Sequence, residues 1–545
     1  MAIVSRRLLV LPLGLALFAA ACAQPTAPQS GPAPTGQSEP KRGGTLTGLV
    51  ASDPNDWDMR SQGKTGVNAQ QHGLVYETLL RFKKGPNVEY ASQVLEPRLA
   101  EKWEVSADGT IYTFNLRKGV KFHNIAPVNG RELTSADVKW SMSYYSAGET
   151  MDGKKLASPV SGTDFMFEGL NTIETPDAST VRVKFKSPYA PFINYTASQW
   201  MPIAAKEVYE ADGHLKNRLI GTGPFTFDEK ASQKGTVWML QKNPAYWQAE
   251  RVYLDTIRKV VISDVSTQQA AFRTKQLDVW TVTAHNVAQS VQAANPQAQL
   301  FTYTIPIGNA LLLSQRKSPA LQDVRVRRAI SMAIDRQEHS KVMFGGDAKP
   351  FLAGSWPGLF TEQEMTALLP YDVNRAKQLL AEAGYAQGLT LEMIITDSDE
   401  TAQHELLQSQ LKKAGIEVKF TMLPREQHRP RLYRGDFDLY RNSGGGLLEA
   451  DADSFLYGEF NSTSTLNWVG VNDSELDKML RATREALDPA KRREAMRTAV
   501  KRINDQAWDP GIIYPAAWAF SQPYVQNWRT HFANGEHEAF VWLDK

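Results

Sequence analysis

Two short stretches of the sequence contain residue types that could bind a metal. Residues 404–408, HELLQ, begin like a zinc-binding helix, but Gln408 stands where the second histidine would be needed. Residues 451–454, DADS, begin like a calcium loop but lack the glycine that such a loop requires two positions later. Neither stretch therefore predicts a metal site.

Residues that could act as nucleophiles or bind phosphate also lack the usual context. The sequence contains no G-x-S-x-G and no G-x-x-x-x-G-K-[ST]. The nine histidines are scattered, and His123 is interpreted as structural. These stretches therefore predict no catalytic residues, no metal and no cofactor. A secreted hydrolase is the remote alternative, and turnover of a candidate solute would reveal it.

The single cysteine, Cys22, follows a segment that is typical of export. Arg6 and Arg7 precede an apolar run over 8–21, which is too short to span a bilayer and suits a signal peptide over 1–21. The run ends in three alanines before Cys22 and resembles a bacterial lipobox, so we expect lipidation of Cys22. Ordinary cleavage with an incidental cysteine is the alternative, and a twin-arginine signal is a weaker one. Residues 22–42, which are rich in proline, would form a lipid-anchored tether.

Composition and charge limit the kinds of protein that the exported part can be. The chain has 545 residues, of which 42% are hydrophobic and 22% charged, so it has material for more than one core. Its net charge of +2 is supplied by the two arginines of the signal, which leaves the remainder formally neutral. A neutral chain argues against nucleic acid as a partner.

Residues 96–140 are the most informative stretch for local structure. Tyr112, Phe114 and Leu116 alternate after a turn at 106–109, which predicts a β-hairpin with one buried face. Thr134 and Asp137 have the spacing of a capping box and predict a helix over 135–146. We further expect a helix over 69–81, a hairpin over 172–186 and a β-α-β unit over 389–422.

The same stretch carries a family resemblance. Three runs within it resemble the hallmark segment of family 5 extracellular solute-binding proteins, the peptide/nickel-type receptors of ABC importers. These runs are LAEKWEVSADG, YTFNLRKGVKFH and LTSADVKWS. Further fragments that are similar to this family occur in order: RGGTLTG (42–48), VYETLL (75–80), IGTGPF (220–225), KNPAYW (242–247), DVRVRRAISMAIDR (323–336), YDVNRAKQLLAEAGY (371–385) and GDFDL (435–439).

This resemblance implies an α/β fold of the two-lobe periplasmic-binding-protein type, with a hinge and a cleft between the lobes. Lobe I would comprise 43–284, enlarged by a subdomain inserted at about 71–190, and lobe II 285–505. Residues 506–545 would return to lobe I. The implied protein is a monomeric receptor, anchored by lipid in the bacterial cell envelope, in the periplasm or at the outer face of the cytoplasmic membrane. It would close on a peptide-like or other small polar solute and deliver it to an ABC permease and its ATPase.

The ligand remains open between peptides, oligosaccharides and opines. Peptide-binding relatives hold the free amine on a carboxylate, and aligning on Phe455 puts Leu448 at that position, with Glu449 one residue out of register. A local gap would restore Glu449 to the role. Candidate ligand-binding residues lie near predicted strand ends or in loops that would face the cleft: Trp57, Trp280, Asn309, Trp356, Arg441, Asn442 and Glu449.

Overall fold

The computed structural model describes residues 39–50, 52–53, 56–60, 72–85, 87–147, 163–396, 401–446, 450–532 and 536–545. Cys22 and Glu449, the predicted signal peptide and most of the predicted tether lie outside the described residues. Residues 40–545 form one unit by their internal contacts. In the part of the chain that is described, no helix is both long and apolar enough to cross a membrane.

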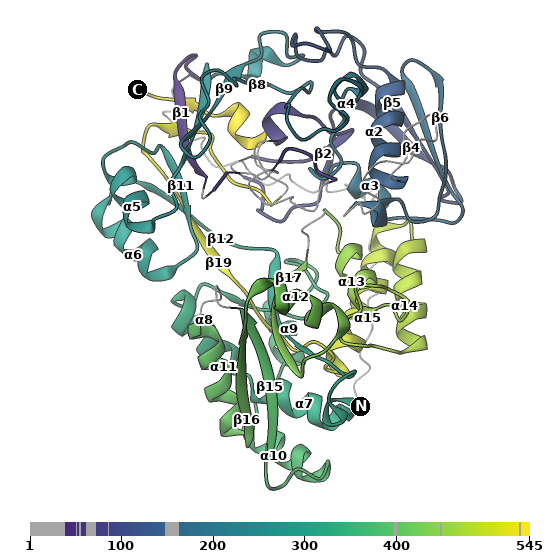
Figure 1. The fold of residues 1–545 in the computed structure, drawn as a ribbon, viewed down its shortest axis with the longest axis vertical. Helices are drawn as coiled ribbons and strands as arrows, with labels where there is room; N and C mark the ends of the chain where they lie inside the picture. The colour runs from purple at the N-terminus through teal and green to yellow at the C-terminus, as the bar shows by residue number, and fades with distance from the viewer. Residues whose placement is uncertain are drawn as a thin grey trace, which may run out of the picture. The chain divides into compact units, whose positions relative to one another are not determined.

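A four-stranded sheet near the start of the chain begins the fold (Figure 1). Its first strand pairs parallel with a strand more than 200 residues later, and the other two pairings are antiparallel. Leu46, Leu240 and Ile257 from three of the strands are fully buried and belong to one core cluster. The strand order is β1 (Thr45–Val50), β10 (Thr256–Val261), β9 (Val237–Lys242) and β8 (Phe225–Phe227).

A second four-stranded sheet is built from the two predicted hairpins, and both predictions are confirmed. Tyr112, Phe114 and Leu116 are buried, as the alternation required, and pack in the same core cluster as the first sheet. The strand order is β4 (Ala100–Val105), β5 (Ile111–Leu116), β7 (Thr180–Phe185) and β6 (Leu170–Asp177).

The predicted capped helix follows as α2 (Ser135–Ala147), and the side chain of Asp137 accepts a hydrogen bond from the backbone N–H of Thr134 at 2.9 Å. The helix predicted over 69–81 is wrong beyond its first turn. Residues 72–75 are helical, but Leu80–Phe82 form β2, which pairs with β3 (Leu95–Pro97).

A buried carboxylate, that of Glu77, holds this half of the molecule together. Glu77 is fully buried, and it accepts hydrogen bonds from Arg98, Thr222, Tyr246 and Trp247. These partners come from three other fragments of the sequence, so one side chain joins four segments. A buried charge is tolerated where it is paired and hydrogen-bonded in this way.

The turn at 220–225 approaches this carboxylate closely because it contains glycines. A Cβ atom at Gly221 would lie 2.2 Å from the carbonyl oxygen of Val75, and one at Gly223 would lie 2.6 Å from those of Leu74 and Val75. His123 packs behind the turn, where its Nε2 lies 3.0 Å from the carbonyl oxygen of Gly223. Burial lowers the pKa of His123 to about 4, so the imidazole is neutral and serves the structure.

A six-stranded sheet forms the other half, with apolar residues buried on both faces. Along β15, which lies between β17 and the edge strand β16, Leu391, Met393 and Ile395 pack on one core cluster and Ile394 on another. Burial on both faces is typical of parallel strands that helices cover. The order is β14 (Lys349–Pro350), β18 (Gly511–Tyr514), β13 (Ile307–Leu313), β17 (Leu439–Gly446), β15 (Leu389–Thr396) and β16 (Ile416–Leu423).

Helices cover this sheet, and the predicted β-α-β unit is confirmed. α11 (Thr401–Lys413) connects β15 to β16, which pair parallel along their whole length. Figure 1 shows α7 (Val324–Ala333), α8 (Arg336–Phe344), α10 (Val373–Glu382) and α11 beside β15 and β16. The other face packs against α9 (Glu362–Leu368), α12 (Arg425–Arg434), α13 (Asp453–Phe460), α14 (Ser474–Glu485) and α15 (Pro489–Asp505).

Two connections join the halves, through a three-stranded sheet of β11 (Val279–Val282), β19 (Ala516–Ser521) and β12 (Gln299–Thr304). The chain passes from β12 to β13 at 305–306 and returns from β18 to β19 at 515. The two crossings touch, because the N–H of Ile305 donates to the carbonyl of Pro515 at 2.9 Å.

Shorter elements complete the described chain. They are α3 (Phe192–Tyr195), α4 (Lys206–Asp212), α5 (Val265–Arg273), α6 (His285–Ala294), the paired strands β20 (Val525–Gln526) and β21 (Trp542–Leu543), and four 3₁₀ turns at Asp164–Phe167, Ala249–Arg251, Pro319–Gln322 and Glu536–Phe540.

Candidate functional site

The carboxyl edge of the six-stranded sheet gathers polar side chains. β15, β16 and β17 run parallel, so their carboxyl ends meet at one edge. β13 runs antiparallel to β17, and Ile307 pairs with Gly446, so the first residues of β13 lie at the same edge. In open α/β sheets ligands bind in the crevice outside the carboxyl ends of the strands. The strand directions therefore mark this edge as the candidate site.

Three side chains from three elements converge there. The amide nitrogen of Asn309, on β13, lies 3.5 Å from Gln403 Oε1, and Arg441 Nη1, on β17, donates to the same oxygen at 3.3 Å. Arg441 Nε lies 3.3 Å from His404 Nε2. Gln403 and His404 are in the first turn of α11, which begins shortly after β15 ends.

The predicted residues Asn309 and Arg441 are thus brought together by Gln403, whereas Asn442 is placed only by its position on β17. Asn442 follows Arg441 on β17 and pairs with Ala310 of β13. Guanidinium and carboxamide groups supply fixed hydrogen-bond donors that match carboxylate oxygens, and the guanidinium does so at two points. The arrangement can hold a carboxylate or another polar group without any reactive residue.

Positive charge reaches beneath the edge. His339, on α8, is buried, and its pKa is lowered to about 4, first by burial and then by the charge of Arg336, with Arg441 contributing as well. Arg336 is itself buried and donates to the carbonyls of Gly511, Ser331 and Ile334. The carboxylate of Glu338 acts on His339 in the opposite direction, so this point already has an anion beside its two arginines.

The predicted tryptophans lie elsewhere. Trp57 is 7% exposed and packs its ring 5.4 Å from that of Trp238 in the first core cluster. Trp280 is 3% exposed, and its indole N–H donates to Gln268 at 3.2 Å within the second cluster. Trp356 is half-buried against the third cluster. The structure does not bring any of these rings to Arg441, and Trp57 and Trp280 serve packing.

Asp451 and Asp453, which begin like a calcium loop, are bound by arginines instead. Asp451 is 1% exposed and accepts from Arg492 Nη2 at 2.7 Å, while Asp453 is fully buried and accepts from Arg484 Nε at 2.7 Å and Nη2 at 2.9 Å. Asn194, beside β6 and β7, donates to Asp451 at 2.7 Å. Among the described side chains, no group of three or more His, Cys, Asp or Glu is placed to hold a metal.

Sequence reasoning missed Gln403 and His404 as members of the site. His404 was considered only for zinc, and Gln403 not at all. The signal that could have found them is their position, since the first helical turn after a parallel strand faces the carboxyl edge.

Comparisons with known proteins give the family. A family model described as "Bacterial extracellular solute-binding proteins, family 5 Middle" matches residues 94–467. Di/tripeptide-binding protein 2 of Pseudomonas aeruginosa is 28% identical over 520 residues, covering 90% of this chain and 93% of that protein. Heme-binding protein A of Haemophilus influenzae is 27% identical over 492 residues, covering 85% and 86%.

A solved structure agrees with these relatives. The ABC transporter-associated periplasmic binding protein DppA of Helicobacter pylori, in complex with the peptide STSA, superposes with a TM-score of 0.76 at 25% identity. The match covers 93% of this chain and 99% of that chain. The fold is therefore of the two-lobe periplasmic-binding-protein type, as predicted. Proteins of this kind are non-enzymatic receptors in the cell envelope that serve ABC importers.

Proposed function

The chain belongs to the bacterial extracellular solute-binding proteins of family 5, and from that premise we propose that it captures a peptide-like solute by a carboxylate held at Arg441. The observation that carries the proposal is the convergence of Arg441, Asn309 and Gln403 at the carboxyl edge of the six-stranded sheet.

The solutes of the relatives support a carboxylate ligand. By their names, those relatives bind di- and tripeptides, heme and the peptide STSA. These solutes differ in size and shape, but each carries at least one carboxylate. A guanidinium can bind a carboxylate through two parallel hydrogen bonds, and Arg441 supplies a guanidinium at the candidate site. An oligosaccharide lacks that group, which places sugars behind peptide-like and opine-type solutes.

Solute capture would proceed by closure about the two crossings at 305–306 and 515. They lie side by side, so a small change of backbone angles there would move one half against the other. A solute that contacts both halves would favour the closed form, because binding shifts a pre-existing equilibrium. We retain the two predicted lobes as a proposal, but we move their boundaries from 284/285 and 505/506 to the crossings at 305–306 and 515, where we propose the hinge.

The experiment measures affinity by calorimetry for trialanine, hemin and maltotriose, with the wild type, Arg441→Gln and the control Arg325→Gln. Arg325 lies on the exposed start of α7 and pairs with Asp323. A charge-assisted hydrogen bond contributes about 1.5–3 kcal/mol, so Arg441→Gln should weaken binding of the carboxylate solute about 10- to 100-fold. The control should bind as the wild type does, and the recovered solute should be chemically unchanged.

Three results would contradict the proposal. They are binding of maltotriose alone, an Arg441→Gln effect no larger than that of the control, or product formed in proportion to protein. Glu449→Gln tests the peptide amine separately, because its role as the amine-binding carboxylate is still a prediction. If Glu449 takes the amine, this variant should lose affinity for trialanine and keep affinity for hemin.

We also propose that Cys22 is lipidated and anchors the protein in the envelope, as a monomer behind a flexible tether. The support is the lipobox-like context of the only cysteine. Two acyl chains give stable membrane attachment where one gives only marginal binding. Cys22→Ser should therefore move the protein from the washed membrane fraction to the soluble fraction. A variant that stays with the membrane after a salt wash would refute the anchor.

A further inference from the structure

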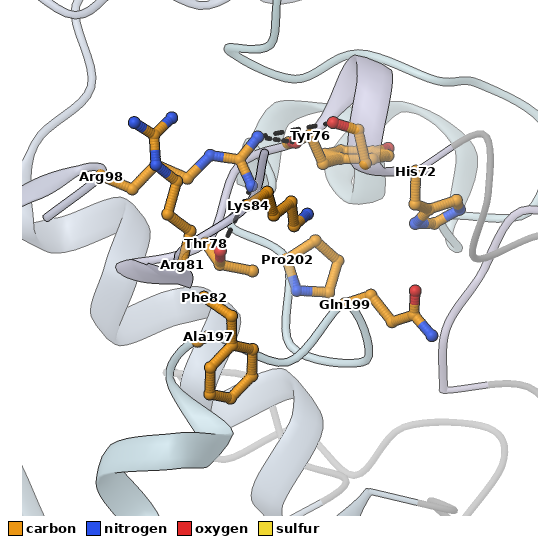
Figure 2. Close-up of a pocket in the computed structure, with 11 residues that line it drawn as sticks. His72, Tyr76, Thr78, Arg81, Phe82, Lys84, Arg98, Ala197, Gln199 and Pro202 are labelled. Atoms are coloured by element: carbon orange, nitrogen blue, oxygen red, sulfur yellow. Dashed lines mark hydrogen bonds between the residues drawn. The ribbon is translucent and has the colours of Figure 1, made fainter. Parts of the chain in front are cut away.

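A small polar pocket lies away from Arg441, in the half of the molecule that contains β1. It is enclosed by segment 72–84, by Arg98 and by segment 197–202 (Figure 2). Its cavity has a volume of about 20 Å³. Roughly 10–15 Å³ is enough for one water-sized group, so the pocket has room for a hydroxyl or for the end of a carboxamide.

Two side chains in the pocket carry unused hydrogen-bonding atoms. His72 is 3% exposed, and neither of its ring nitrogens has a hydrogen-bond partner among the described residues. The same holds for Gln199 Oε1. Figure 2 shows the Gln199 amide and the His72 ring on the same side of the pocket. Buried polar atoms are usually satisfied, so these atoms indicate a group that binds between them.

The His72 ring is held in place and uncharged. Its centroid lies 5.0 Å from that of Tyr76 and 6.4 Å from that of Trp57. Burial lowers the pKa of His72 to about 3. A neutral imidazole offers one donor and one acceptor, and the carboxamide of Gln199 also offers both. The pocket therefore suits a group that donates and accepts.

The charged side chains around the pocket repel an ammonium group, and they would bind an anion only weakly because the arginines already have carboxylate partners. Arg98 donates to the buried Glu77 at 3.1 Å, and Arg81 lies 3.4 Å from Glu96, so both guanidinium groups have carboxylate partners. An ammonium would face these arginines and Lys84, while a carboxylate would compete with acids already in place. An uncharged hydroxyl or carboxamide meets neither obstacle.

The pocket borders the junction between the two halves of the molecule. Phe82 lines it, and the Phe82 ring lies 5.4 Å from that of Phe532. Phe532 packs against both the first and the third core clusters, which belong to different halves. The wall of the pocket at Phe82 therefore lies next to the junction of the two halves.

We propose that this pocket is a second subsite, in which His72 and Gln199 bind an uncharged hydroxyl or carboxamide of the captured solute. The inference rests on the proposed function, since it takes the solute to be peptide-like. It adds a preference for peptides that carry a side chain such as that of serine or asparagine, while Arg441 holds the carboxylate.

The test compares four peptides: trialanine and the three peptides in which one alanine is replaced by serine. Calorimetry is done with the wild type, His72→Phe and Gln199→Leu, which keep the approximate shape of the side chains. The control is Gln248→Leu, because Gln248 Oε1 is also buried without a partner in the described chain but lies outside the pocket. Melting curves establish that each variant is folded.

We expect the wild type to bind one serine peptide at least about tenfold more tightly than trialanine. His72→Phe and Gln199→Leu should lose that preference and still bind trialanine as the wild type does, while Gln248→Leu keeps the preference. Equal binding of all four peptides, or a preference that survives in both variants, would overturn this inference alone. Binding of none of the four would overturn it together with the peptide part of the proposed function. If His72→Phe does not fold, Gln199→Leu decides.

Discussion

Asp509 offers a stability experiment whose size can be worked out from the structure. It is 2% exposed, and neither carboxylate oxygen has a hydrogen-bond partner in the described chain. It lies in the turn before β18, beside Leu312, Phe460 and Glu459. Burial raises the pKa of Asp509 to about 7, from about 3.9 for an ordinary aspartate. The perturbation is Asp509→Asn, which imitates the protonated acid and cannot ionise.

The sign and the magnitude follow from the two pKa values. Between about pH 4 and 7 the folded chain holds a proton that the unfolded chain has released, so the free energy of unfolding falls as pH rises. The stabilisation by the bound proton is complete at low pH and is lost as pH rises through 7. A difference of about three pKa units at 1.36 kcal/mol each amounts to about 4 kcal/mol. Asp509→Asn should therefore match the wild type near pH 4 and exceed it by about 4 kcal/mol at pH 8.

The assay is the melting temperature of both proteins from pH 4.5 to pH 8.5. The difference between them isolates Asp509, because the other groups titrate equally in both. It should be small at the acid end, rise through pH 5–7 and level off above. Asp505→Asn is the control, since Asp505 is exposed and its pair with Arg328 is a surface pair. A difference that does not change with pH, or a variant that is less stable at pH 8, would refute the reasoning.

Two further substitutions test the buried carboxylates. Glu77→Gln should lower the free energy of unfolding by about 3–5 kcal/mol, because it leaves the charge of Arg98 buried without its carboxylate. The exposed pair of Glu210 with Lys206 should contribute about 0–1 kcal/mol, so Glu210→Gln is the control. Asp453→Asn should also lower the free energy of unfolding by about 3–5 kcal/mol, because it leaves the charge of Arg484 buried without its carboxylate. The affinity of the folded variant for solute should stay within about threefold of that of the wild type. Both costs are read from melting curves, and melting temperatures equal to the wild type would contradict the buried-pair argument.

Local features of the fold were predictable because short sequence rules decide them. Asp323, Asp372 and Asp488 each accept a backbone N–H at the start of a helix, which is the rule for aspartate at that position. Lys275 is an exception to such rules. It adopts φ 61°, a left-handed conformation that glycine favours.

The helix predicted over 69–81 failed because tertiary contacts override local pattern. Apolar spacing at 74–80 suits a helix, but Glu77 must face Arg98 and the turn at Thr222. That requirement draws the chain into extended structure, which ends in β2. Three of the fragments that resemble the family, 75–80, 220–225 and 242–247, meet at this carboxylate through Glu77, Thr222 and Tyr246, so in these three the resemblance reflects packing.

The candidate site was only partly predictable, because strand register decides which side chains reach it. Trp280 was expected at a strand end, but it pairs opposite Phe520, and its face of β11 packs in the second core cluster. Asn309 reaches the edge because the register of β13 shifts between Gly308 and Ala310. Such a bulge re-aims a side chain. Gly308 allows it, since a Cβ there would lie 2.3 Å from the Phe351 ring. A change of one residue in this register would turn Asn309 away from Gln403.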